Sequence, residues 1–150
     1  MTDEIHESYR HYRNSAVALS VTVIAVSGAM LLRLEQMLSS NSAVAYRPVS
    51  LAFMIVFVVC ILEALVLQYR HFEGYRDFAT SQNCWDTGDR MSQDNPHRTQ
   101  KWMEAEKLRI SSNSHFTNVE KIAGRMLSHC VYGVAGFYSW SLTALIVTSF

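Results

Sequence analysis

The chain of 150 residues balances 13 Lys and Arg against 13 Asp and Glu, and 49% of its residues are hydrophobic. Because nucleic-acid binding calls for a basic face, this neutral chain is not expected to bind nucleic acid. Its three cysteines, Cys60, Cys84 and Cys130, are an odd number without paired spacing, which argues against a disulfide framework or a cysteine-rich metal site.

The apolar residues gather in three runs, 16–32, 49–69 and 126–150, of 17, 21 and 25 residues. A hydrocarbon core of roughly 30 Å takes about 20 helical residues to cross, within a range of about 17 to 25. The sequence therefore predicts an all-α, polytopic membrane protein that forms a single membrane domain over residues 1–150. Its three transmembrane helices are placed at about 16–38, 49–69 and 126–150, with a helical cytoplasmic segment at 71–125.

The first helix is expected over residues 4–38. Within it, four small residues recur at intervals of four, three and four and so share one face: Ala18, Thr22, Ala25 and Ala29. Small side chains let helices approach closely in lipid, so this stripe is a candidate packing face, either within one protomer or between the protomers of an oligomer.

The second helix is expected to begin at Pro48, because proline suits a first helical turn. Its apolar run is interrupted by one acid, Glu63, about two thirds of the way along. A carboxylate in hydrocarbon costs at least about 2.5 to 3.5 kcal/mol, so it should face the bundle or water. The expected partners are His129 of the third span and Arg70 of the same helix. The acid either stabilises the bundle or lines an ion or proton path.

Aromatic and basic residues flank the first two spans on one side of the membrane. Aromatic rings prefer the headgroup level and Arg attracts anionic lipid, which predicts an interfacial belt. The alternative is a ring of His and Arg around a cytoplasmic vestibule in an oligomer. The residues expected to contact lipid headgroups are Tyr9, Arg10, Tyr12, Arg13, Tyr69 and His71.

The cytoplasmic segment is expected to continue the second helix beyond the membrane and to break it near Gly88. A new helix is expected to start at Pro96. The serine-rich stretch 111–114 should interrupt that helix, and Thr117 has capping-box spacing with the acid three residues on. The third membrane helix is therefore predicted to begin at Asn118.

The third span carries a second stripe of small residues, in which Gly133 and Gly136 follow His129 at helical spacing. These two glycines are the packing candidates of this helix. Nine of the thirteen Lys and Arg lie between residues 70 and 125. The positive-inside bias therefore predicts a multi-pass protein of the plasma (inner) membrane, with the amino terminus and 71–125 in the cytoplasm and the carboxyl terminus outside.

No catalytic or cofactor motif is recognisable, since the six histidines include no HExxH pair and there is no Gly-rich phosphate loop. We expect no enzyme activity, no metal and no cofactor; haem ligation by His129 and a histidine of another helix is an open alternative. The layout is similar to that of small bacterial membrane proteins such as the SLATT-type effectors of conflict systems. The third span departs from their two-span plan.

Two functions fit these observations. The first is a homo-oligomeric pore or channel-like bundle in the lipid bilayer, in which Glu63 and the stripe of the third span that contains His129, Gly133 and Gly136 line or stabilise the core. The second is a non-catalytic accessory or anchoring subunit of a larger membrane complex, which docks a protein partner through 71–125. The residues expected to supply that docking surface are Trp85, Trp102, Met103 and Leu108.

Overall fold

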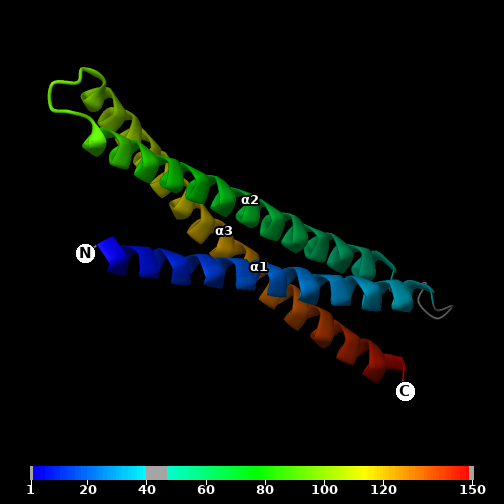
Figure 1. The fold of residues 1–150 in the computed structure, drawn as a ribbon. Coiled ribbons are helices and arrows are strands. Elements are labelled where there is room, and N and C mark those ends of the chain that lie inside the picture. Colours follow the sequence, from blue (N-terminus) through cyan, green and yellow to red (C-terminus); the bar gives the residue numbers. More distant parts are fainter. Residues whose placement is uncertain (1, 40–46, 149–150) are drawn as a thin grey trace. The chain divides into compact units, whose positions relative to one another are not determined.

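The computed structural model describes the backbone of residues 2–39 and 47–148, and the side chains of 15–39, 47–144 and 146. Over these residues the chain consists of three helices and contains no strand (Figure 1). The helices are α1 (Thr2–Ser39), α2 (Arg47–Arg90) and α3 (His97–Thr148). The prediction of an all-α fold is confirmed.

The helix ends follow the local chemistry of the sequence. Pro48 lies in the first turn of α2, where its missing N–H is not needed. Asn95 caps α3, because its Oδ1 accepts a hydrogen bond from the backbone N–H of His97 at 2.9 Å, and Pro96 lies between them. α2 runs two residues beyond Gly88 before it ends.

The predicted interruption at 111–114 is wrong, because α3 is one continuous helix. Serine weakens a helix when its hydroxyl competes for backbone groups of its own turn. Here the hydroxyl of Ser111 donates to Oδ2 of Asp77 at 2.7 Å, and that of Ser112 donates to the carbonyl oxygen of Gly74 at 2.8 Å. Both serines bond to α2 and so leave the backbone of α3 intact.

The predicted start of the third membrane helix at Asn118 is wrong as well, because α3 runs through this position. The hydroxyl of Thr117 donates to the carbonyl oxygen of Asn113, one turn back in the same helix, at 3.0 Å. Thr117 therefore lies inside α3 and caps nothing. The capping-box spacing therefore occurs inside a helix here and does not mark a helix start.

The chain divides into two compact units. Unit 1 comprises Met1–Val66 and Ile122–Phe150, and therefore contains α1, the first part of α2 and the last part of α3. Unit 2 comprises Leu67–Lys121, in which α2 and α3 are joined by the turn at 91–96.

The core of unit 1 takes one residue from each helix, Leu34, Phe57 and Phe137, none of which is more than 3% exposed. Phe53 packs edge-on against Phe137, with ring centroids 5.9 Å apart. Large aromatic rings thus pack between α2 and α3 in this part of the unit.

Both predicted packing glycines of α3 lie against this aromatic region. A Cβ on Gly133 would stand 3.0 Å from Cγ1 of Val56, and one on Gly136 would stand 3.2 Å from Cε1 of Phe53. Glycine at these two positions lets α3 approach α2 more closely than any other residue would.

The predicted small-residue stripe of α1 does not face the other helices. All four of its members are exposed: Ala18, Thr22, Ala25 and Ala29. The buried face of the same helix is instead formed by Ala16, Ser20, Val23, Ser27 and Leu34. Both sets have helical spacing, which identifies a face without saying what covers it. As a contact within one protomer the stripe is wrong, and as an oligomer contact it stays a prediction.

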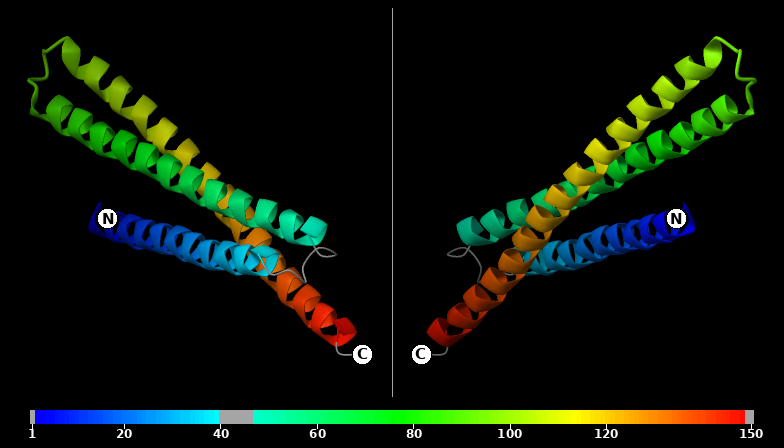
Figure 2. Two further views of the ribbon diagram at one scale, coloured as in Figure 1. Left: turned by 90° about the vertical axis from the view of Figure 1, so that its right-hand side faces the viewer. Right: turned by 90° about the vertical axis from the view of Figure 1, so that its left-hand side faces the viewer.

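Unit 2 is an antiparallel helical hairpin, in which α2 and α3 run side by side in each view (Figure 2). Small residues recur every seven positions along its buried interface, the spacing of coiled coils. They are Gly74, Ser81 and Gly88 on α2, and Ala105 and Ser112 on α3. The hydroxyl of Ser81 donates to the carbonyl oxygen of Ala105 at 2.8 Å.

Two helices of the described chain are long and apolar enough to cross a membrane: Ser15–Ser39 within α1, and α2. By length and composition these helices are compatible with membrane insertion. A third span is not confirmed. The segment predicted for it, 126–150, belongs to α3 up to Thr148, and residues 149 and 150 lie outside the described residues.

Candidate functional site

Unit 1 brings the acid of the second span together with two basic residues of α3. Oε1 of Glu63 accepts a hydrogen bond from Nε of Arg125 at 2.7 Å, and Oε2 lies 3.0 Å from Nδ1 of His129. Glu63 is 12% exposed, whereas Arg125 and His129 are 61% and 44% exposed. The cluster is therefore buried on its α2 side and open on its α3 side.

The two expected partners of Glu63 have different outcomes. His129 lies beside the carboxylate as expected, but Arg70 pairs with Glu73, one turn along α2, at 3.3 Å. Arg125 is the partner that sequence reasoning missed. It precedes His129 by four residues and so lies on the same helical face, which is the signal that could have identified it.

The Glu63 cluster can do two things chemically. Arg125 keeps a fixed positive charge beside the carboxylate, so the acid does not lie uncompensated among apolar side chains. His129 adds a ring nitrogen that either donates or accepts a hydrogen bond, depending on its tautomer. The cluster therefore fastens α2 to α3 and offers an exposed imidazole at the same point.

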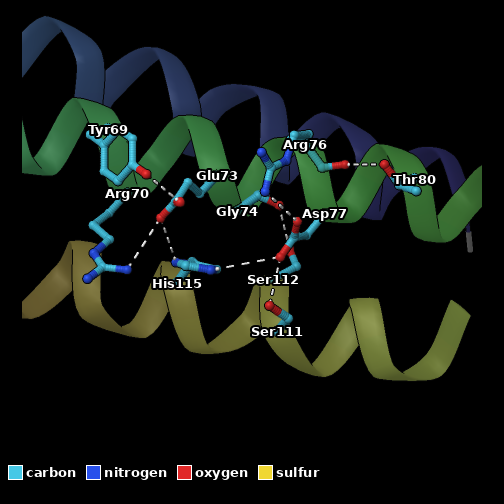
Figure 3. A network of polar contacts seen from close by, with 10 residues as sticks. All are labelled: Tyr69, Arg70, Glu73, Gly74, Arg76, Asp77, Thr80, Ser111, Ser112 and His115. Carbon is cyan, nitrogen blue, oxygen red and sulfur yellow. Dashed lines mark hydrogen bonds and ion pairs between the residues drawn. The ribbon is translucent and has the colours of Figure 1, made fainter. Parts of the chain in front are cut away.

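Unit 2 contains a second acid–histidine cluster, in which the ring of His115 on α3 lies between two acids of α2 (Figure 3). Its Nδ1 is 3.7 Å from Oε2 of Glu73, and its Nε2 is 3.8 Å from Oδ2 of Asp77. Tyr69 donates to Glu73 and Ser111 donates to Asp77, each at 2.7 Å. With His115, Glu73 and Asp77 all between 12% and 19% exposed, this is a largely buried polar network.

The two clusters have the same spacing along the helices. Glu63 and Asp77 are 14 residues apart on α2, and His115 and His129 are 14 residues apart on α3. Fourteen residues are two heptads, so an acid and a histidine recur at matching positions of two antiparallel helices. This repeat is not apparent from the predicted elements, because a third helix that begins at Asn118 would leave His115 outside it.

The exposed surface of α3 in unit 1 is mixed, with hydroxyl groups more frequent on one edge, where Ile146 is also exposed, and aliphatic residues more frequent on the other, where Tyr138 is also exposed. Four residues on one edge carry hydroxyl groups and are spaced by four, seven and four: Ser128, Tyr132, Ser139 and Thr143. We call them the α3 polar stripe. Tyr132 is 75% exposed, and on the other edge Leu127 and Val131 are 44% and 55% exposed. On the helical wheel, Arg125 and His129 continue the polar edge toward the Glu63 cluster.

The residues predicted to contact lipid headgroups are only partly described. Tyr69 is 59% exposed, whereas His71 is 5% exposed and its ring lies 5.7 Å from that of Phe116. Burial against α3 therefore leaves His71 little surface for lipid. The side chains of Tyr9, Arg10, Tyr12 and Arg13 lie outside the described residues.

Only some of the residues predicted to dock a partner are exposed. The rings of Trp85 and Trp102 lie 6.2 Å apart, and the guanidinium of Arg98 lies 4.5 Å from the centroid of the Trp102 ring. These side chains pack within unit 2. Met103 is 57% exposed, and Leu108 is half-buried.

Within the part of the chain whose side chains are described, no group of three or more His, Cys, Asp or Glu could hold a metal ion. No protein-family model, no curated protein and no solved structure matches this chain. The geometry of the two clusters and of the α3 polar stripe is therefore the basis for a functional proposal.

Proposed function

We propose that the chain is an integral protein of the plasma (inner) membrane with three spans, at about 16–38, 49–69 and 126–150. Large aliphatic side chains on the outside of unit 1 support this, such as Ile55 and Leu142, each 65% exposed. The core helix of a soluble protein is mostly buried, whereas only 22% of the apolar window of each candidate span is buried. Such a surface is costly in water and is matched by lipid.

In the proposed topology the amino terminus and the segment 71–125 lie in the cytoplasm and the carboxyl terminus lies outside. The concentration of Lys and Arg between residues 70 and 125 supports this orientation. Arg125 directly precedes the proposed third span, so in this topology its contact with Glu63 supports a position of the carboxylate near the cytoplasmic boundary of the membrane. Glu63 then lies closer to the headgroups than its place in the apolar run suggests.

We further propose that several copies assemble into a pore-like bundle lined by the α3 polar stripe. Exposed hydroxyl-bearing residues on a membrane helix are less favourable against lipid than against water or another helix. The hydroxyls of Ser128 and Thr143 each donate to a carbonyl one turn back at 2.9 Å, which lowers but does not remove this penalty. One chain presents the stripe on its outside, so a ring of copies is needed to enclose a path.

Glu63 has a supporting role in this proposal. Its side chain is 12% exposed and both its carboxylate oxygens contact α3, so the acid holds the two helices together. Arg125 and His129 are the more exposed members of the cluster. They would stand at the cytoplasmic end of the path and favour anions there.

Flux through proteoliposomes tests the pore. Ser139→Cys places a thiol on the α3 polar stripe, and Val131→Cys places one on the aliphatic edge of the same helix. The native cysteines Cys60, Cys84 and Cys130 are buried, which makes the unsubstituted protein a suitable background. A membrane-impermeant charged thiol reagent should reduce flux through the Ser139→Cys protein and leave the Val131→Cys protein and the unsubstituted protein unchanged.

Two results would count against the pore. One is the absence of flux from the purified protein at varied pH and voltage. The other is equal sensitivity of the Ser139→Cys and Val131→Cys proteins to the reagent, because a path lined by the stripe must distinguish the two edges.

A non-catalytic accessory subunit is the second candidate, and the exposed apolar residues of unit 2 favour it. Met103 and Ile110 are 57% and 58% exposed and lie seven residues apart, on one face of α3. Replacing both with Ser should release a protein partner that co-purifies in mild detergent while leaving self-association unchanged. Purification of the unsubstituted chain without any other protein would argue against this candidate.

A further inference from the structure

A groove of about 600 Å³ lies between α1 and α2 within unit 1. Its walls are apolar apart from one charged group at one end, Glu35. The lining residues are Gly28, Leu31, Leu32, Glu35, Met54 and Val58. Gly28 leaves part of the groove unfilled, because a Cβ built on it would meet no atom within 4 Å.

The groove has a polar end and an apolar end in the order that a membrane lipid requires. Gly28 and Glu35 are seven residues apart, so they are separated by about 10 Å along α1. In the proposed topology Glu35 lies at the outer headgroup level and Gly28 lies deeper in the hydrocarbon. Glu35 forms no ion pair with any residue whose side chain the structure describes.

We propose that this groove binds one acyl chain of a phospholipid whose headgroup carries a primary amine. Apolar walls that face hydrocarbon gain dispersion contacts when a chain fills the space between them, and lose those contacts when the space is empty. The carboxylate of Glu35 then pairs with the ammonium group and selects it over a quaternary or anionic headgroup. The inference rests on the proposed membrane location of unit 1 and is independent of the pore.

Two glycine substitutions provide a matched test. Gly28→Leu adds an apolar side chain to the wall of the groove, at a position where nothing lies within 4 Å of the added Cβ. Gly124→Leu is the control, because Gly124 also has open space around its Cβ but does not line the groove. Glu35→Gln keeps the shape of the groove and removes the charge.

The measurement is native mass spectrometry of the full chain, purified in mild detergent and equilibrated with equal amounts of phosphatidylethanolamine, phosphatidylcholine and phosphatidylglycerol. The unsubstituted chain and the Gly124→Leu protein should retain phosphatidylethanolamine over phosphatidylcholine by about fivefold, as one exposed ion pair allows. Glu35→Gln should bring this ratio close to one. Gly28→Leu should lower the retention of all three lipids.

Equal lipid retention by the Gly28→Leu and Gly124→Leu proteins, or an unchanged preference in the Glu35→Gln protein, would overturn the proposal. So would efficient crosslinking between two copies through Leu31→Cys, because a second chain would then occupy the groove. Alkaline extraction of native membranes tests the proposed membrane location separately from the lipid site. Release of the chain from the membranes would contradict the proposed membrane location. A chain that stays in the membranes but binds no lipid after purification would contradict only the lipid site.

Discussion

The contact between Glu63 and Arg125 gives a prediction whose size can be worked from the structure. The perturbation is a double-mutant cycle in which Glu63→Gln and Arg125→Gln are made singly and together. Two unit charges 4 Å apart interact by about 4 kcal/mol at an effective dielectric constant of about 20. Exposed ion pairs are screened to about 1 kcal/mol or less. With Glu63 12% exposed and Arg125 61% exposed, we expect a coupling energy of about 1 to 2 kcal/mol, between these limits.

The two single substitutions should also differ. Glu63→Gln leaves Arg125 without a partner, but that guanidinium is already mostly hydrated. Arg125→Gln leaves a largely buried carboxylate with His129 alone, which is the costlier outcome. We therefore expect Arg125→Gln to lower the free energy of unfolding by about 1 kcal/mol more than Glu63→Gln does.

Reversible unfolding by sodium dodecyl sulfate in detergent micelles, followed by circular dichroism, measures all four proteins of the cycle. A coupling energy indistinguishable from zero would refute the pairing. A larger loss from Glu63→Gln than from Arg125→Gln would refute the reasoning on burial, even if the pairing itself survived.

Three further predictions concern other contacts. Gly133→Ala should lower the free energy of unfolding by about 1 kcal/mol, because its Cβ would crowd α2. Gly124→Ala should raise the free energy of unfolding by about 0.5 to 1 kcal/mol, because alanine has the higher helix propensity and the added Cβ meets open space. Changes of the same sign in detergent unfolding would contradict this prediction. Ser112→Ala removes a buried bond to α2 and should cost about 1 kcal/mol, so an unchanged melting temperature would refute that bond. A hydrogen bond from Arg109 lowers the pKa of Glu106, so the pair stabilises the helix above the usual glutamate pKa and this contribution is lost as the pH falls through the lowered pKa. Glu106→Gln should remove that part of the acid dependence of helix content, and an unaltered pH profile would speak against it.

Much of the fold could be predicted from the sequence, because strong local signals mark the helices. Pro48 and the Asn95–Pro96 pair are typical of a helix start. An apolar run of membrane length is typical of a helix. The errors arose at Ser111, Ser112 and Thr117. A hydroxyl at such a position can cap or break the helix, bond back within it as that of Thr117 does, or bond across to α2 as those of Ser111 and Ser112 do. Only the structure shows which applies.

The candidate site was predictable to a smaller extent, because spacing identifies a face without identifying its neighbour. Glu63 was recognised from its cost in an apolar run, and His129 from its depth. Arg125 lies just before the third run, where its charge indicates the orientation of the chain and does not identify a partner. The α1 stripe failed for the same reason, since helical periodicity fits its exposed residues as well as its buried ones.

The hydroxyl bonds between the helices of unit 2 are reciprocal, and this affects how the hairpin responds to force. Ser81 on α2 donates to the backbone of α3, and Ser112 on α3 donates to the backbone of α2, each at 2.8 Å. A slide of α3 along α2 by one turn, about 5.4 Å, breaks both bonds together, and it breaks them whichever helix is pulled. The two bonds together therefore fix the register of α2 against α3 in this hairpin.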